Sequence, residues 1–212
     1  DEKYANLLDG KQRIVKEEEM KRTLYVSDLD GTLLNSQSVL SETTIATLNR
    51  ILQEKKALFT IATARTPATV VDLMKEVKCS LPFVLMAGAV LWNDSKQNYE
   101  RVRAIPSATV DKLLEIYGHY TIRPFIYRRH GNCLFVYHTF ELTESERQFI
   151  EPRIQSPFKR LVTTESLTAQ NPDDSVLVYS MGSYATLLNI ANEIRASQLP
   201  CTLSCYQDIF DC

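Results

Sequence analysis

Glycine and proline are scarce in this sequence, and it contains neither a long apolar run nor a marked excess of one charge. Only 6 of the 212 residues are glycine and 8 are proline, whereas 44% are hydrophobic. These proportions exclude a collagen-like or low-complexity chain and are sufficient for a sizeable buried core. We therefore expect one large domain or two small ones.

Charge and hydropathy limit the kinds of molecule that the protein is expected to bind. The formal net charge is −2, and no basic stripe with interleaved aromatic residues is present, so we expect no nucleic-acid partner. The longest apolar stretch, residues 83–92, is too short to cross a bilayer, and the charged first residues contain no apolar signal segment. We expect a soluble, cytoplasmic protein that acts on small molecules and does not bind a membrane.

The five cysteines are an odd number, which favours reduced thiols over a disulfide framework. Cys201, Cys205 and Cys212 could together bind zinc. The CxxC spacing of zinc sites is missing, however, and the three histidines lie elsewhere in the sequence. A zinc site is therefore the weaker interpretation.

The first half of the chain alternates between the apolar period of strands and that of helices, which is typical of a parallel sheet. Residues 1–22 are highly charged and are expected to form a loose tail or leader, with Met20 as a candidate natural start. We then expect strands at 23–27, 57–62 and 82–87, a helix at about 41–56 with Ser41 as its N-cap, and a helix beginning at Thr66-Pro67.

After about residue 95 the pattern becomes that of an α+β module. The sequence predicts a helix from an N-cap at Ser107 to Gly118, a β-hairpin turning at 130–132, a helix opened by the capping box of Thr143 and Glu146, a strand at 175–181, a helix at 183–196 and a last strand near 201–206. We thus expect a core at residues 23–95 and a second module at residues 96–212.

Two acidic residues follow the first expected strand in the sequence LYVSDLDGTLL. Asp28 and Asp30 are two positions apart, so in extended backbone their side chains point the same way while Leu29 turns toward the core. The carboxyl ends of parallel strands form the crevice where open α/β sheets bind ligands. One carboxylate can act there as a nucleophile while the other transfers a proton, and Thr32 adds a hydroxyl.

Asp-Gly alone often does no more than form a turn, so the second strand decides between the two interpretations. That strand ends in Thr63-Ala64-Arg65, which places a hydroxyl and a cation at the same edge of the sheet, next to a helix N-terminus suited to anions. Each feature alone is ordinary: Thr63 could simply satisfy the strand end and Thr66 could simply cap the helix. Together, on neighbouring strands, they predict a phosphate site.

DLDGTLL, followed by T-A-R at a second strand end and then by an α+β insertion, resembles the haloacid-dehalogenase-like phosphatases, of the Cof type with a type-2 cap. The resemblance implies an α/β fold, with a Rossmann-like parallel-sheet core, here its N-terminal part only, and an inserted α+β cap domain. It implies Mg²⁺-dependent hydrolysis of small phosphorylated metabolites through an aspartyl-phosphate.

The family's residue roles can be carried over to Asp28, Asp30 and Thr63. Asp28 would be the nucleophile and Asp30 the acid/base, and both would hold Mg²⁺, Asp30 through its main-chain carbonyl. Thr63 would bind phosphate, and Arg65, where such sequences often read T-G-R, would touch substrate. Thr32 is also expected to bind phosphate or substrate, because its hydroxyl lies in the turn after Asp30. One departure from the family pattern is Ala87-Gly88-Ala89, where relatives commonly read N-G-A.

Two parts of the family's site have no counterpart in the 212 residues. Relatives carry a lysine after the cap and then an acidic motif, roughly G-D-x-x-x-D; Lys159 lies within the expected cap, and Asp173-Asp174 precede a strand. We therefore expect this segment alone to be nearly inactive, and the strand before Asp28 to be an exposed edge. A phosphate-binding regulatory remnant and a phosphomutase-type phosphotransferase are the alternatives.

A group of cap residues is expected to set specificity: Arg123, Tyr127, Arg128, Arg129 and His130.

Overall fold

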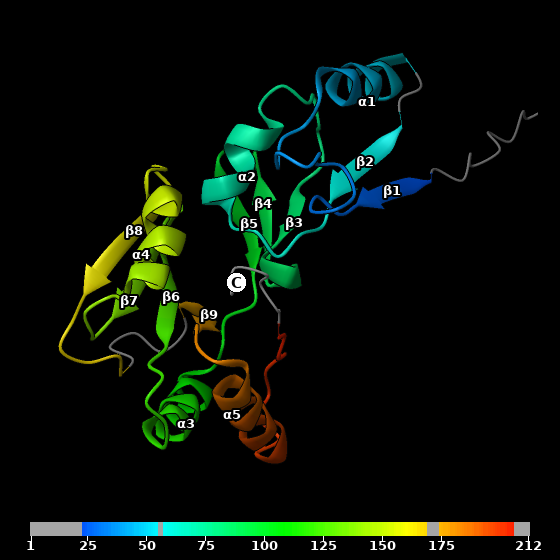
Figure 1. The fold of residues 1–212 in the computed structure, drawn as a ribbon. Coiled ribbons are helices and arrows are strands. Elements are labelled where there is room, and N and C mark those ends of the chain that lie inside the picture. Colours follow the sequence, from blue (N-terminus) through cyan, green and yellow to red (C-terminus); the bar gives the residue numbers. More distant parts are fainter. Residues whose placement is uncertain (1–22, 55–56, 169–173, 206–212) are drawn as a thin grey trace, which may run out of the picture.

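The computed structural model describes residues 23–54, 57–168 and 174–205, and its first strands form the predicted parallel sheet. Strand β1 (Leu24–Ser27) pairs in parallel with β2 (Leu58–Ile61), and β3 (Phe83–Leu85) joins β2 through a parallel bridge between Ala62 and Val84. Helices α1 (Glu42–Glu54) and α2 (Pro67–Met74) connect these strands (Figure 1). The three strands therefore direct their carboxyl ends toward one edge.

Helices α1 and α2 begin where the sequence predicts them, although only α1 has a side-chain cap. The Ser41 hydroxyl accepts a hydrogen bond from the Thr44 main-chain N–H at 3.1 Å, which satisfies an otherwise free donor of α1. Thr66 precedes α2 in an extended conformation, but its hydroxyl makes no capping bond. The hydroxyl of Thr66 is buried and has no hydrogen-bond partner among the described residues.

A β-hairpin that the sequence did not predict follows β3. After a single turn of 3₁₀ helix, η2 (Met86–Gly88), strands β4 (Val90–Asn93) and β5 (Asn98–Val102) run antiparallel, and the three strands form a sheet in the order β3-β4-β5. The expected boundary at residue 95 falls in the turn of this hairpin. The division into residues 23–95 and 96–212 stays a prediction.

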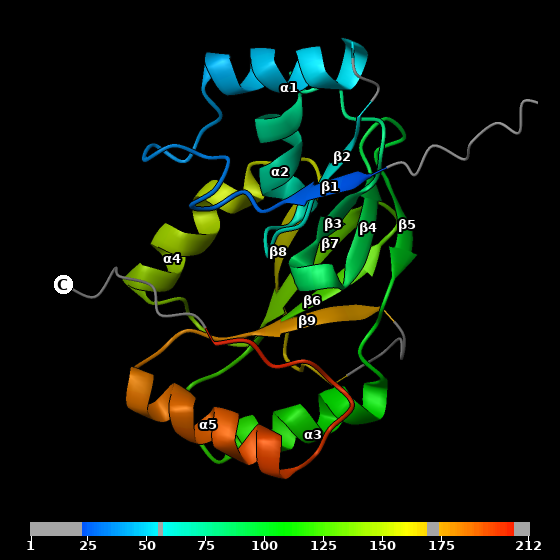
Figure 2. The ribbon, with the colours of Figure 1, turned by 90° about the vertical axis from the view of Figure 1, so that its right-hand side faces the viewer.

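The second half of the chain forms a four-stranded sheet in the order β8-β7-β6-β9. Its elements are α3 (Ser107–Gly118), β6 (Phe125–His130), β7 (Cys133–His138), α4 (Glu144–Ile150), η3 (Glu151–Ile154), β8 (Lys159–Thr163), β9 (Ser175–Tyr179) and α5 (Tyr184–Ala196). Figure 2 shows α3 and α5 together on one side of this sheet, with the first three strands on the other side.

Most of the predicted elements of this half are present, with three differences. The predicted hairpin, the capping box of Thr143 and Glu146, and the 183–196 helix are confirmed. Ser107 is the first residue of α3, after Pro106, and makes no side-chain cap. Strand β8 was not predicted, and residues 201–205 form no strand although one was expected at 201–206; residue 206 lies outside the described residues.

One apolar cluster joins the two halves. It includes Ile61, Val70 and Met74 from the first half and Tyr127 and Phe158 from the second. The Trp92 and Phe158 rings meet edge to face with their centroids 5.1 Å apart, a favoured aromatic geometry. Burial of this cluster therefore fixes the second sheet against the first.

Strand β1 forms an exposed edge, as the sequence predicts. Within the described residues β1 pairs with β2 alone, and Leu24, Tyr25 and Val26 are 50%, 58% and 52% exposed. Apolar side chains on both faces of an edge strand favour association with a further strand.

No helix in the described part of the chain is long and apolar enough to cross a membrane.

Candidate active site

The residues predicted to carry chemistry lie at the carboxyl ends of β1 and β2. Asp28 directly follows β1. The main-chain carbonyl of its neighbour Ser27 accepts a hydrogen bond from the Ala62 N–H at 2.8 Å, which joins the ends of β1 and β2. Leu29 is completely buried, while Asp28 and Asp30 are exposed. The expected alternation of two outward acids around an inward leucine is therefore present.

The Asp28 carboxylate is held on one side only. Its Oδ1 accepts a hydrogen bond from the Leu29 main-chain N–H at 2.7 Å. No hydrogen bond or ion pair joins Oδ2 to any other described residue. One oxygen of Asp28 is thus held by the main chain, and the other is left without a partner in this part of the chain.

The turn after Asp30 depends on Gly31, whose φ of +70° lies in the left-handed region. The N–H groups of Thr32, Leu33 and Leu34 then all point at the Leu29 carbonyl oxygen, at 3.2, 3.0 and 3.0 Å. This tight turn holds Asp30 and Thr32 at the surface beside Asp28. The Thr32 side chain is exposed and makes no hydrogen bond to another described residue.

Asp30 and Arg65 form a bidentate ion pair across the ends of β1 and β2. Arg65 Nε donates to Asp30 Oδ2 at 2.9 Å and Nη2 donates to Oδ1 at 2.7 Å, which is the fork geometry that arginine offers to carboxylates. These hydrogen bonds lower the pKa of Asp30; partial burial opposes them, and the Arg65 charge adds to the lowering. The pair therefore favours an ionised Asp30.

Thr63 lies beneath this pair and is buried. Its hydroxyl oxygen accepts a hydrogen bond from the Arg65 main-chain N–H at 3.2 Å, which leaves its own proton available to donate. Its main-chain N–H donates to the Val84 carbonyl at 3.0 Å. The structure thus links Thr63 to Arg65 and Arg65 to Asp30 by hydrogen bonds, with Asp28 on the neighbouring strand.

The loop after β3 closes against the same strand ends, a contact that little in the sequence predicts. Met86 N–H donates to the Arg65 carbonyl at 3.0 Å and Ala87 N–H donates to the Thr63 carbonyl at 3.1 Å. Met86 and Ala87 both have φ of 53°, a conformation that asparagine tolerates better than alanine. The only signal was the departure from N-G-A at residues 87–89.

The donor set fits a magnesium ion better than zinc. Among the described residues, no three histidine, cysteine or acidic side chains lie close enough to hold a metal together, so a metal here would meet the Asp28 carboxylate and main-chain oxygens. Mg²⁺ accepts such a site because it keeps several of its waters. The zinc site considered at Cys201, Cys205 and Cys212 includes a residue outside the described part of the chain.

The five residues expected to set specificity do not form one site. Tyr127 and Arg128 are buried, and Arg128 Nη2 donates to the Leu167 carbonyl at 2.7 Å. His130 is exposed near the hairpin turn, while Arg123 lies before the other end of β6. Neighbouring positions on β6 face opposite sides of the sheet, which separates Tyr127 and Arg129 from Arg128 and His130.

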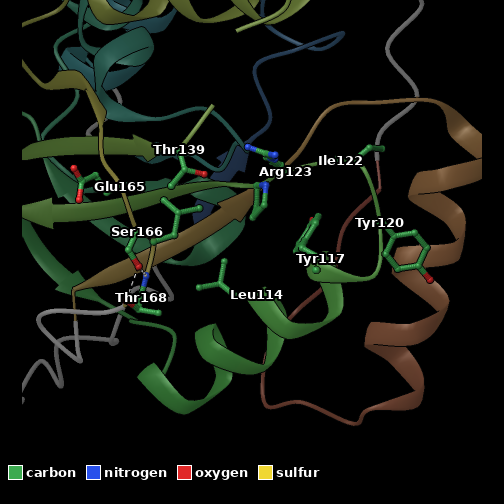
Figure 3. Close-up of a pocket in the computed structure, with 12 residues that line it drawn as sticks. Leu114, Tyr117, Tyr120, Ile122, Arg123, Thr139, Glu165, Ser166 and Thr168 are labelled. Atoms are coloured by element: carbon green, nitrogen blue, oxygen red, sulfur yellow. Dashed lines mark hydrogen bonds between the residues drawn. The ribbon is translucent and has the colours of Figure 1, made fainter. Parts of the chain in front are cut away.

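Arg123 instead lines a cavity of about 450 Å³ beside α3. Figure 3 shows Arg123 and Thr139 on one side of it and Leu114 on the opposite side. All its lining residues belong to residues 114–168. None of the residues predicted for the phosphate site lines this cavity.

Comparison with known proteins agrees with the geometry of the strand ends. Residues 25–197 match the model of the haloacid dehalogenase-like hydrolase family. No curated protein matches the chain in a sequence search.

Solved structures show the same fold. A haloacid dehalogenase-like hydrolase from Bacteroides thetaiotaomicron matches with a TM-score of 0.63 at 20% identity, covering 82% of this chain and 63% of that one. A protein of the same description from B. subtilis gives 0.59 at 16%, covering 83% and 67%. A HAD subclass IIB sugar phosphatase gives 0.60 at 15%, covering 82% and 64%.

The chain spans less than two thirds of the first of these relatives, and at such low identity the structural likeness establishes the fold alone. The family match covers most of the chain. The chain belongs to the haloacid dehalogenase-like hydrolase family.

Proposed function

We propose that the protein hydrolyses small phosphomonoesters through an aspartyl-phosphate on Asp28. The observation that carries this proposal is the meeting of Asp28, Asp30, Thr63 and Arg65 at the ends of two parallel strands. Two acids, a hydroxyl and a guanidinium are the groups that a phosphoryl-transfer site needs. Sugar phosphates are among the candidates, because one structural relative is a sugar phosphatase.

In the proposed reaction the free Oδ2 of Asp28 attacks phosphorus. The bond from phosphorus to the leaving oxygen breaks, and that oxygen takes a proton from Asp30. Water then attacks the phosphorus of the acyl phosphate after giving its proton to Asp30, and Asp28 is regenerated with release of phosphate. The hydrogen bond from Leu29 to Asp28 Oδ1 orients the carboxylate for the first step.

The phosphate oxygens would be held by residues from both strands. The Thr63 hydroxyl can donate to one oxygen, and the Arg65 guanidinium can bind two. Thr32 adds an exposed hydroxyl from the turn. A magnesium ion held by the Asp28 carboxylate and the Asp30 main-chain carbonyl would supply the charge neutralisation that lets an anionic nucleophile approach an anionic ester.

The 212-residue chain alone is expected to turn over very slowly. It contains no counterpart of the family's lysine and second acidic motif, and the loss of one preorganised electrostatic partner typically costs about 10²–10³ in rate. This observation favours a second candidate, a phosphate-binding protein without turnover. Reading the gene beyond Cys212 for an in-frame lysine followed by G-D-x-x-x-D separates the two candidates.

A phosphate-release assay on the full-length gene product tests the proposal. With a panel of phosphorylated metabolites we expect release in the presence of Mg²⁺ and its loss when EDTA removes the metal. Activity that is the same with and without EDTA would contradict a magnesium site at Asp28 and Asp30. Binding of inorganic phosphate without any release would favour the second candidate.

A further inference from the structure

The pairing of Arg65 with Asp30 conflicts with the roles that both residues have in the proposed reaction. Both carboxylate oxygens of Asp30 and two of the three guanidinium nitrogens of Arg65 are used in this contact. A leaving-group oxygen must therefore compete with Arg65 for the Asp30 carboxylate. An incoming phosphate likewise finds the Nε–Nη2 edge of Arg65 already bound.

We propose that Arg65 is a two-position side chain that holds Asp30 in the empty site and moves to the phosphate when substrate binds. The release of Asp30 by this movement makes its carboxyl group available to the leaving oxygen. Substrate binding therefore assembles the acid/base. The inference rests on the proposed function and adds an ordered exchange to it.

The main chain around Arg65 is fixed while its side chain is accessible. The Arg65 N–H is bound to the Thr63 hydroxyl at 3.2 Å, and its carbonyl accepts the Met86 N–H at 3.0 Å. The side chains of Arg65 and Asp30 are 25% and 53% exposed. The head group can thus turn about its own bonds without any movement of the strand ends.

The energy of such an exchange is small. An ion pair at this exposure contributes about 0–1 kcal/mol, and a phosphate dianion offers the guanidinium the same fork geometry with more charge. The Thr63 hydroxyl lies next to the Arg65 main chain, so phosphate bound there is within reach of the side chain. The two anions therefore compete for one cation.

A double-mutant cycle on phosphate binding tests this competition without requiring turnover. The dissociation constant of inorganic phosphate is measured by calorimetry for wild type, Asp30→Asn, Arg65→Gln and the double variant. Asp30→Asn is expected to tighten binding up to about fivefold, because it removes the competing anion. In the Arg65→Gln background the same change should alter binding by less than about twofold.

A matched control uses another exposed ion pair, Lys112 with Glu115 on α3. Glu115→Gln and Lys112→Gln should leave phosphate binding unchanged. Thermal unfolding checks that the Asp30 and Arg65 variants fold, since the loss of an exposed pair has little effect on stability.

The outcomes separate the exchange from the proposed function. An equal gain with and without Arg65 would show that Asp30 merely repels phosphate, and no gain from Asp30→Asn would show that Arg65 does not leave it. Either result overturns the exchange and leaves the phosphate site intact. If neither wild type nor Asp30→Asn binds phosphate, the phosphate site and the exchange are both wrong.

Discussion

Replacing Asp28 with asparagine is expected to lower phosphate release by the full-length gene product by about 10⁴-fold or more. Asparagine keeps the size of the side chain, and its amide oxygen can still accept the Leu29 N–H that now binds Oδ1. The amide is not a nucleophile, however, so no acyl phosphate can form. The measurement is the initial rate of release from the best phosphomonoester at saturating Mg²⁺.

The control for this substitution is Asp72→Asn, an exposed acid on α2 that makes no ion pair within the described residues. Its release rate should equal that of wild type. An Asp28→Asn enzyme that keeps the wild-type rate would show that Asp28 is not the nucleophile. Loss of activity in both variants would point to a general effect on folding.

Replacing Lys159 with methionine is expected to stabilise the protein near neutral pH. Lys159 is 3% exposed, it lies beside the Tyr127 ring, and no described carboxylate pairs with it. Burial, followed by repulsion from Arg153, lowers the pKa of Lys159 from 10.5 to about 8. At pH 7 the folded protein must therefore keep an unfavourable buried charge, which methionine removes while filling a similar volume.

The pH dependence of this effect has a definite sign. In the folded protein the Lys159 amine loses its proton near pH 8, whereas in the unfolded chain it keeps the proton to about 10.5, so the unfolded state binds more protons in between. The wild-type free energy of unfolding should gain a contribution of up to about 3 kcal/mol between these two pH values. The advantage of Lys159→Met is thus largest below pH 8 and shrinks above it.

Urea unfolding at a series of pH values measures this difference, with Lys96→Met, at an exposed lysine in the β4–β5 turn, as the control. The control should follow the wild-type curve. Parallel curves for wild type and Lys159→Met between pH 7 and about pH 10 would show that Lys159 titrates as it does in the unfolded chain.

The core strands were predictable because local patterns and tertiary packing agree there. Residues 24–27 and 58–61 are short apolar runs that end at polar, chemistry-bearing residues, and each is followed by a helical pattern with a start signal. The same agreement holds for the hairpin around Gly131, whose φ is +61°, and for the capping box at Thr143.

The β4–β5 hairpin was missed because the run of residues 83–92 reads as a single apolar segment. The chain reverses within it, at Met86 and Ala87, which adopt positive φ although neither is glycine. The conformation depends on hydrogen bonds from this loop to Thr63 and Arg65, which are distant in sequence. A local pattern cannot contain that information.

Strand β8 was missed for a similar reason. It begins with Lys159-Arg160, which reads as surface, yet Lys159 is buried under the packing of the second sheet. Tertiary packing buries this side chain although it is polar. The burial lowers the pKa of Lys159, and the Lys159→Met experiment measures the effect of that change on stability.

In the active site the sequence indicated the edge of the sheet but not the contacts along it. Asp28, Asp30, Thr63 and Arg65 could be assigned to neighbouring strand ends from the order of strands and helices. The bidentate ion pair between Asp30 and Arg65, which are 35 residues apart, depends on side-chain rotamers that no spacing rule specifies. The unpaired hydroxyl of Thr66 likewise contradicts the simple capping role that its position suggests.

The most direct measurement of the central claim is the identification of the phosphorylated residue. The full-length gene product is mixed with a phosphomonoester and Mg²⁺, quenched in acid within one turnover, digested, and mapped by mass spectrometry. We expect an acid-stable, hydroxylamine-sensitive phosphoryl group on Asp28, and none in the Asp28→Asn protein. A phosphoryl group on another residue, or release of phosphate with no labelled peptide at any quench time, would contradict it.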